Sequence, residues 1–337
     1  MDARRLGAGM YDPGRGDEPV GTRAIRAPVG PHEPARTNRF AVYRLDAGAG
    51  NVAVDAARHA FGPGAMLFLA PYRRVRFDAD APLVGEVIEF HANFLCVETF
   101  HAEVGCAGVL FNDPYGVPSL TLDGPTAAEV RELFARISSE LERRGLAYQE
   151  VALAYLKVLL VVASRIKSGG GGACGASDAA RRHPLLVRLG ELIEAHYRES
   201  RSPADYADAL HVTPKSLGRL VREHLGTTIT ELVRDRVLIH AKWQLLHTLR
   251  PVKEIAREVG FADELYFSRL FRRAVGLSPT AFREFETEIR GGSNLSMTSG
   301  PPSIPAPPSS PDNPLEAGGD GGREAAARTA RGRKSGR

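Results

Sequence analysis

The strongest constraint on the fold of this chain is residues 252–283, VKEIAREVGFADELYFSRLFRRAVGLSPTAFR. Apolar residues recur there at three- and four-residue steps on both sides of Gly260, which predicts two short helices joined by a tight turn. Gly260 suits that turn because a residue without a Cβ adopts a left-handed backbone without strain. Asp263 is placed to cap the second helix, and Ser278–Pro279 would begin a third. A helix-turn-helix of this kind can place one helix in the major groove of DNA.

A weaker copy of the pattern lies upstream in residues 202–226, SPADYADALHVTPKSLGRLVREHLG. Ser202 and Thr213 are each followed by proline, as expected of residues that cap helices. Between the copies, residues 229–249 are predicted to form one helix, roughly 30 Å long at about 1.5 Å per residue. That length approaches one DNA turn of ~34 Å, so two units could read successive major grooves. An isolated helix pair could equally be a simple helical hairpin, but the capped duplication favours DNA binding.

The side of each unit that faces away from the apolar residues supplies the candidate DNA contacts. In the second unit, Glu264, Leu265 and Ser268 are candidates for base contacts. Arg269 and Arg272 could either recognise guanine or hold phosphates. The first unit leaves four polar residues on its exposed side: Lys215, Ser216, Arg219 and Arg222.

Charge and cysteine content narrow the class of protein. The 337 residues include 44 Lys and Arg against 40 Asp and Glu, a net charge of +4. Residues 183–290 are nearly neutral, with 17 Lys and Arg against 15 Asp and Glu. DNA affinity must therefore come from the placement of a few cations rather than from general positive charge. Three cysteines are too few for a disulfide framework, and no signal peptide or membrane span is evident. We therefore expect a cytoplasmic, nucleoid-associated protein.

The pattern along the chain predicts a multidomain α+β protein. Residues 38–167 begin with short runs rich in β-branched and aromatic residues, such as FAVYRLDAG, and end with helical periods at 127–144 and 148–166. These features predict a small β-barrel or sandwich with a helical pair that either packs on the sheet or forms a dimer seam. Residues 183–290 contain helical patterns only.

Three further segments are predicted to lack regular structure, because they are rich in Gly, Pro, Ser or charge and poor in apolar periodicity. They are an N-terminal arm at 1–37, a Gly-rich linker at 168–182 and a tail at 291–337. The basic residues at the end of the tail either stay solvated or add weak phosphate contacts.

These motifs resemble the AraC/XylS family of bacterial transcription regulators. The resemblance covers residues 186–285 and rests on RVLIHAKWQLLHT in the linking helix and on I-A, G-F, Y-F-S-R, F-R-R, G-L-S-P and F-R in the second unit. It implies a two-headed domain that binds double-stranded DNA and, in an activator, contacts RNA polymerase. It assigns DNA-binding roles to seven residues: Lys215, Ser216, Arg219, Glu264, Ser268, Arg269 and Arg272.

The strand pattern of residues 38–167 resembles the cupin-like sensor domain of the same family, more weakly. That resemblance implies a barrel that binds an unidentified small-molecule effector or forms a homodimer. Tyr72, Arg73 and Arg74 could meet an anionic effector at the barrel mouth, or the arginines could simply be exposed on a strand.

A second chemistry is conceivable because His91, Cys96, His101 and Cys106 recur every five residues. They could bind a metal ion or sense oxidants, but the spacing lacks the close pairs of common zinc sites, and buried cysteines with hydrogen-bonded histidines are the plainer interpretation. Metal-bearing cupin enzymes carry an H-x-H pair, whereas His59 stands alone. We therefore expect no catalysis and no cofactor. The alternatives are a cupin-type metal-dependent enzyme, or a thiol or metal sensor, carrying a helical interaction module.

Overall fold

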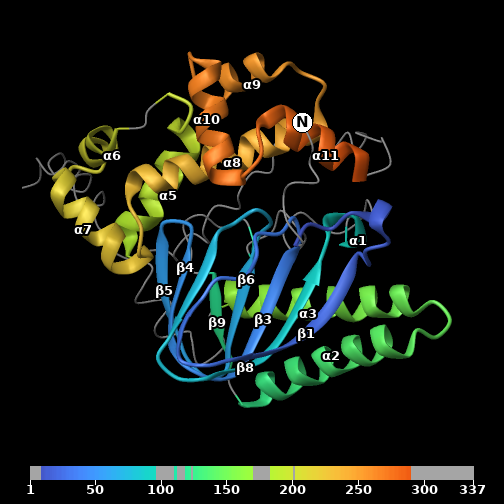
Figure 1. Ribbon diagram of the computed structural model, residues 1–337. Helices are drawn as coiled ribbons and strands as arrows, with labels where there is room; N and C mark the ends of the chain where they lie inside the picture. Colours follow the sequence, from blue (N-terminus) through green and yellow to red (C-terminus); the bar gives the residue numbers. More distant parts are fainter. Residues whose placement is uncertain are drawn as a thin grey trace, which may run out of the picture. The chain divides into compact units, whose positions relative to one another are not determined.

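The computed structural model describes residues 9–95, 110–111, 118–122, 124–169, 183–199 and 202–289. Its N-terminal region consists of two antiparallel sheets (Figure 1). The larger sheet has the order β1 (Val20–Ala27), β8 (Leu83–Phe90), β3 (Phe40–Ala47), β6 (Ala65–Leu69) and β9 (Ser119–Thr121). The smaller sheet has the order β2 (Gly30–His32), β7 (Val75–Ala79), β4 (Gly50–Val54) and β5 (Ala57–Phe61). Two single-turn helices, η2 (Pro13–Arg15) and α1 (Ala92–Leu95), flank them.

The central strands β3 and β6 of the larger sheet are largely buried on both faces, which explains their nearly continuous apolar sequences. Because side chains alternate along a strand, Phe40 and Val42 of β3 belong to one apolar cluster and Tyr43 and Leu45 to another. The second cluster fills the space between the two sheets and includes residues of both, such as Phe77 of β7.

Two long helices cover the outer face of the larger sheet, α2 (Gly124–Arg143) and α3 (Tyr148–Gly169) (Figure 1). Val130, Phe134 and Ile137 on α2 are fully buried in the cluster that also contains Ile88 and Phe90 of β8. The predicted barrel or sandwich with a packed helical pair is therefore confirmed.

The N-terminal region differs from the sequence expectation in its first segment. The predicted arm at 1–37 is wrong for residues 20–32, because β1 pairs along its whole length with β8 and β2 pairs with β7. Most β1 side chains stay partly exposed, so this edge strand is held by backbone pairing and lacks the apolar alternation that a sequence search detects. Residues 50–61 are two strands joined at Asp55, which adopts a left-handed backbone. The Gly-rich linker beyond residue 169 and the tail at 291–337 lie outside the described residues.

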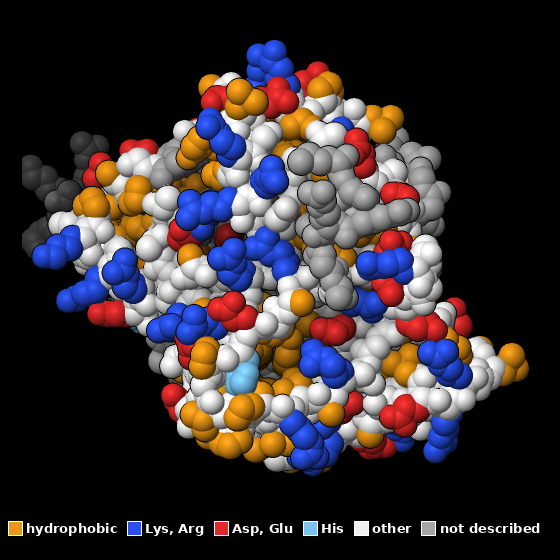
Figure 2. Space-filling view, viewed as in Figure 1, with side chains coloured by type: hydrophobic (Ala, Val, Ile, Leu, Met, Phe, Trp, Pro, Cys, Tyr) orange, Lys and Arg blue, Asp and Glu red, His pale blue; other side chains and the backbone are white. Residues whose placement is uncertain are grey.

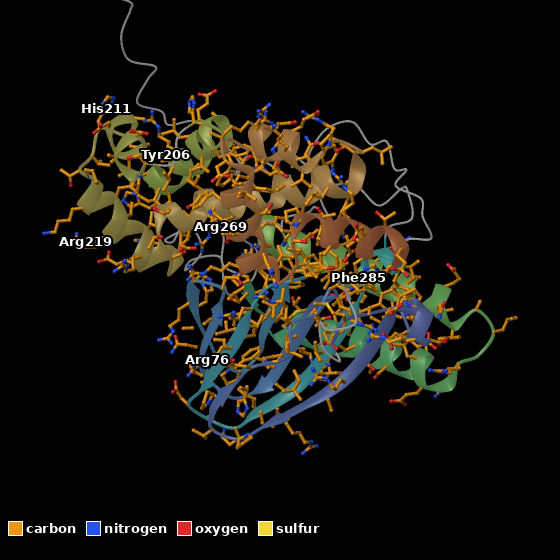
Figure 3. All side chains as sticks on the ribbon, turned by 45° about the horizontal axis from the view of Figure 1, so that its top comes forward. Arg76, Tyr206, His211, Arg219, Arg269 and Phe285 are labelled. Carbon is orange, nitrogen blue, oxygen red and sulfur yellow. The ribbon has the colours of Figure 1, made fainter. Side chains whose placement is uncertain are left out.

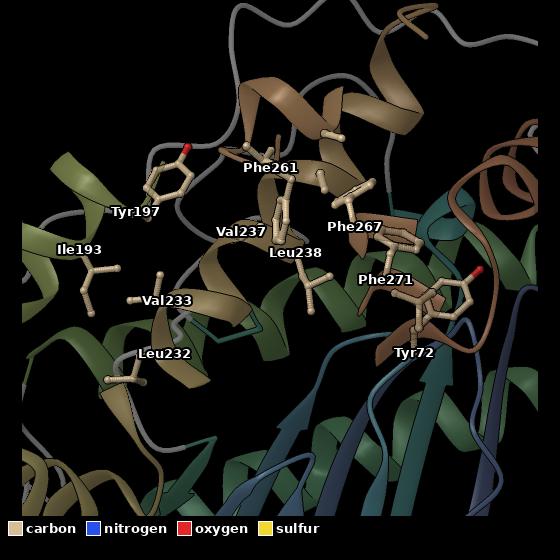
Figure 4. Close-up of a cluster of buried hydrophobic side chains, with 14 of the residues drawn as sticks. Tyr72, Ile193, Tyr197, Leu232, Val233, Val237, Leu238, Phe261, Phe267 and Phe271 are labelled. Carbon is tan, nitrogen blue, oxygen red and sulfur yellow. The ribbon is translucent and has the colours of Figure 1, made fainter. Parts of the chain in front are cut away.

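In the described part of the C-terminal region the regular elements are all helices, and the two helix-turn-helix units share one core. Its helices are α5 (Pro184–His196), α6 (Pro203–Ala209), α7 (Pro214–Leu225), α8 (Ile229–His247), α9 (Val252–Glu258), α10 (Glu264–Val275) and α11 (Pro279–Ile289). Figure 4 shows Val233 and Val237 of α8 between Ile193 of α5 and Phe267 of the second unit. The linking helix is thus a core element shared by both units.

Candidate nucleic-acid interface

The second helix-turn-helix unit has the predicted local geometry. Helix α9 ends before Gly260, which has φ +87°, in the left-handed region that glycine tolerates best. The amide of Leu265 donates to Asp263 Oδ1 at 2.8 Å and so caps α10. Gly276, with φ +93°, ends α10 by donating its amide to the carbonyl of Arg272. The turn and both ends of the second helix are therefore fixed by short-range interactions.

The first unit also has capped helices, but its turn lacks a glycine. The Ala204 amide donates to Ser202 Oγ, and the Ser216 amide donates to Thr213 Oγ1, each at 3.2 Å. In its turn, His211 adopts φ +56° where the second unit has a glycine. A histidine carries some strain in this conformation. Because the glycine that marks the turn of the second unit is replaced here, the first unit is harder to recognise in the sequence.

The second helices of the two units, α7 and α10, are called here the reading helices. On α7, Leu217 and Val221 are buried, while the candidate residues are all exposed: Lys215, Ser216, Arg219 and Arg222. On α10, Phe267 and Phe271 are buried. Its candidates lie on the other side, with Leu265, Arg269 and Arg272 exposed and Glu264 and Ser268 half-buried. The predicted division of each helix into a core side and an open side is confirmed, and the DNA contacts themselves stay predictions.

Exposed cations on the reading helices are available to a ligand. Arg219 forms an ion pair with Glu223 at 3.6 Å, but both side chains are more than half exposed, at 78% and 58%. Exposed pairs of this kind are worth about 0.5 kcal/mol, so this pair would not hold Arg219 away from a phosphate. Figure 2 shows Lys and Arg side chains spread over the helical region, and Figure 3 labels Arg219 and Arg269 on α7 and α10.

An exposed apolar side chain lies among the polar ones on α10. Leu265 is 72% exposed at the start of the helix, beside the capping Asp263. Leucine at the tip of a helix in the major groove can contact the methyl group of thymine, which is the apolar feature of that groove. The reading helix therefore presents both cationic and apolar groups, the combination that direct recognition of base edges requires.

The candidate effector residues lie where the sheet region contacts the helical region. Tyr72 is buried, packs against Phe282 with ring centroids 5.2 Å apart, and donates its hydroxyl to Glu286. Arg73 lies 2.8 Å from both Asp55 and Asp235, and these carboxylates raise its pKa despite the opposing effect of burial. Arg74 is exposed. Tyr72 and Arg73 thus already have partners within the chain, and an effector role for the three residues stays a prediction.

A small cavity of about 60 Å³ lies beside Arg73, with His59 and Phe68 of the sheet region and Asp235 of α8 among its lining residues. A volume of that size holds a few atoms only, far less than the 300–1,000 Å³ or so typical of ligand pockets. In its present conformation, the cavity would need to widen to admit a drug-sized effector.

The candidate metal residues are described only in part. His91 is buried, and its ring packs tilted against that of Tyr11 with the centroids 4.7 Å apart. Its Nδ1 accepts from the backbone amide of Asn93, and its Nε2 lies 3.5 Å from Glu286. Cys96, His101 and Cys106 lie outside the described residues. Within the described ranges, no three His, Cys, Asp or Glu side chains come together in a way that could hold a metal ion. Across the same ranges, no helix has the length and apolarity needed to cross a bilayer.

Sequence comparison agrees with this geometry. A family model described as a helix-turn-helix domain matches residues 206–284. The arabinose operon regulatory protein of Salmonella typhimurium is 30% identical over 152 residues, covering 45% of this chain and 52% of that protein. The transcriptional activator RhaS of Enterobacter is 30% identical over 162 residues, covering 47% of this chain and 55% of that protein. The helical region is an AraC-family helix-turn-helix domain.

Each of these matches covers only part of the two proteins compared. The chain spans about half the length of these two curated relatives. Among solved structures, the C-terminal domain of the response regulator AraT from Geobacillus stearothermophilus is 31% identical. The match covers 30% of this chain and 85% of that domain, with a TM-score of 0.30.

Proposed function

We propose that this protein is a sequence-specific DNA-binding transcription regulator whose two reading helices enter successive major grooves of one duplex. The observation that carries the proposal is the duplication itself: two capped reading helices, each with an apolar side in the shared core and cations on the open side. Helix α8 joins them and has 19 residues, which at about 1.5 Å per residue gives roughly 28 Å. This is close to the ~34 Å between successive major grooves on one face of DNA.

The chemistry of binding would divide between phosphates and bases. Arg222 and Arg272 occupy the last turns of their helices, and in this proposal they hold phosphates. Leu265 and Arg269 lie earlier on α10, where base edges are within reach of a helix that enters by its N-terminal half. Because the helical region is nearly neutral overall, we expect it to neutralise only a few DNA phosphates. Each neutralised phosphate should contribute about −0.9 to the slope of log affinity against log salt concentration.

The sheet region would regulate DNA binding by the helical region. Its contacts with the helical region through Tyr72 and Arg73 offer a route by which an effector or a partner subunit could alter DNA binding. RhaS is named a transcriptional activator, and we propose activation through contact with RNA polymerase for this chain as well.

Substitution of one reading-helix arginine tests the proposal. An operator is selected from random DNA with the wild-type protein, and affinities are measured for wild type, Arg269→Ala and Arg76→Ala. Arg76 is a matched control because it is exposed on β7 of the sheet region (Figure 3). Arg269→Ala should weaken operator binding by about 1–3 kcal/mol and relax the preference at one base pair if it recognises guanine. If it holds phosphate, the loss should be uniform across sequences. Equal affinities for the three proteins would refute a reading role for α10, and a salt slope near zero would point to a module that binds protein instead.

A further inference from the structure

The linking helix α8 carries a row of buried polar residues that core packing does not require. Arg236, His240 and Gln244 are 3%, 0% and 4% exposed and follow one another at four-residue steps. Residues at that spacing lie on one side of a helix, one turn above another. The row is flanked by apolar core residues such as Val237 and Ala241.

At one end, the row is bonded to α5, the helix that precedes the first helix-turn-helix unit and shares its apolar core. Arg236 donates through Nε to both carboxylate oxygens of Glu194 on α5, each at 2.8 Å. The same guanidinium lies 4.5 Å from the ring centroid of Tyr197, which caps the C-terminal end of α5. Charge-assisted and cation–π contacts on one side chain fix both the position and the tilt of α5 against α8.

In the middle, His240 joins the two ends, and its partners assign its protons. Its Nδ1 lies 2.9 Å from Tyr197 Oη, and its Nε2 lies 3.2 Å from Gln244 Nε2. Because an amide nitrogen only donates, His240 Nε2 must accept, and Nδ1–H must then donate to Tyr197. The neutral imidazole that this pattern requires agrees with its burial and with nearby Arg198 and Arg236, which lower the pKa of His240 to about 4.

At the other end, the row is bonded to the second unit. Gln244 Nε2 donates its other hydrogen to Glu258 Oε1 at 2.8 Å, and Glu258 closes α9. Glu258 is also paired with Arg250 in the turn between α8 and α9. A continuous series of polar contacts thus runs from Glu194 on α5, along α8, to Glu258 in the second unit. All its links are hydrogen bonds except the cation–π contact between Arg236 and Tyr197.

The buried polar row constrains how the helices are oriented more than it stabilises the fold. Within the described part of the chain, Gln244 Oε1 and Arg236 Nη1 are buried without a hydrogen-bond partner, and such groups are unfavourable compared with an apolar core. Apolar contacts tolerate sliding and rotation, whereas hydrogen bonds are directional, and a buried polar residue at a helix seam is known to fix register. A shift of either unit relative to α8 would leave further buried polar groups unbonded.

We propose that the Arg236–His240–Gln244 row sets the orientation of the two reading helices relative to each other, and so determines which half-site spacing the protein accepts. The inference rests on the proposed function. The three side chains are positioning residues, because they contact neither base nor phosphate but hold the elements that do. Adding one base pair moves the second groove about 3.4 Å along the DNA and turns it by roughly 35°, so a rigid reader must reject such a site.

The test compares operators that differ only in spacing. The selected operator is remade with one base pair removed or added between its halves, and affinities are measured for wild type and for His240→Leu/Gln244→Leu. Wild type should prefer the selected spacing by about tenfold or more, because a rigid reader cannot meet both half-sites of a respaced operator. The double variant should lose most of that preference while binding an isolated half-site as wild type does.

Two further variants separate orientation from stability. Val237→Ala removes a buried apolar side chain from the same helix and should lower the melting temperature while keeping the spacing preference. Gln244→Leu removes the bonds to His240 and Glu258 but keeps the histidine, and it gives the same test if the double variant does not fold. An unchanged spacing preference in a folded polar-row variant, or an equal loss in Val237→Ala, would overturn the inference. A wild-type protein that selects no operator would instead refute the proposed function on which the inference rests.

Discussion

Lowering the pH should destabilise the helical region through one residue, His240. Burial, helped by Arg198, Arg236 and Arg250 and opposed by Glu258, lowers the pKa of this histidine from 6.5 to about 4. Well above pH 6.5, His240 is neutral in both the folded and the unfolded chain, so its titration does not change the free energy of unfolding. Below pH 6.5 the unfolded chain takes up a proton that the folded chain refuses, so stability falls until the pH reaches about 4.

The size of the effect follows from the change in proton affinity. Each tenfold change in proton affinity is worth about 1.4 kcal/mol, so a pKa lowered from 6.5 to about 4 corresponds to at most about 3 kcal/mol. Most of this loss should be visible by pH 4.5. For a domain whose total stability is typically about 5–15 kcal/mol, a loss of that size is readily measured.

The assay is urea unfolding of wild type and His240→Asn at several pH values between 7.5 and 4.5. The fluorescence of Trp243 reports on the helical region, because it is the only tryptophan of the chain and lies on α8. Its ring lies 5.1 Å from His247, so each pH needs its own folded baseline. Other titrating groups are common to both proteins and cancel in the difference. Wild type should be the more stable at pH 7.5, and its advantage should shrink by about 2–3 kcal/mol at pH 4.5. A difference that stays constant with pH would refute a neutral, buried His240.

Two substitutions in the second unit test the structural part of the account. Gly260→Ala places a Cβ on a backbone with φ +87°, which should cost about 1–2 kcal/mol in the same urea assay, and no loss would mean that the turn is not left-handed. Phe267→Ala empties a fully buried site and should cost about 3–5 kcal/mol, while a loss below 1 kcal/mol or so would show that Phe267 lies outside the core.

The sequence predicted the reading units well because their determinants are local. Asp263 and Thr213 bond to amides two or three residues away, and Gly260 needs no distant partner to form its turn. Capping residues and turn glycines lie next to the helices that they end, so they can be recognised from the sequence alone. The open sides of α7 and α10 followed from the same periodicity, since aromatic and aliphatic residues occupy the remaining positions.

The sequence was less informative where distant segments meet. In the linking helix, the apolar Trp243 and Leu246 are only half-buried, whereas the polar His240 and Gln244 are buried. Helix α8 packs against both units, so its buried residues lie on several sides of the helix and no single apolar face stands out. Its polar row was missed because His240 and Gln244 interrupt the apolar pattern and their partners lie elsewhere in the chain. A search for polar residues at four-residue steps in an apolar helix would have found it.

The most direct test of the central claim is a hydroxyl-radical and methylation-protection footprint of the wild-type protein on its selected operator. Two reading helices joined by α8 should protect two major-groove segments on one face of the duplex, about 10–10.5 base pairs apart. Arg269→Ala should weaken protection in the segment read by α10 more than in the other. Protection of a single major-groove segment by the wild-type protein, or of segments on opposite faces, would contradict the account of a paired reader.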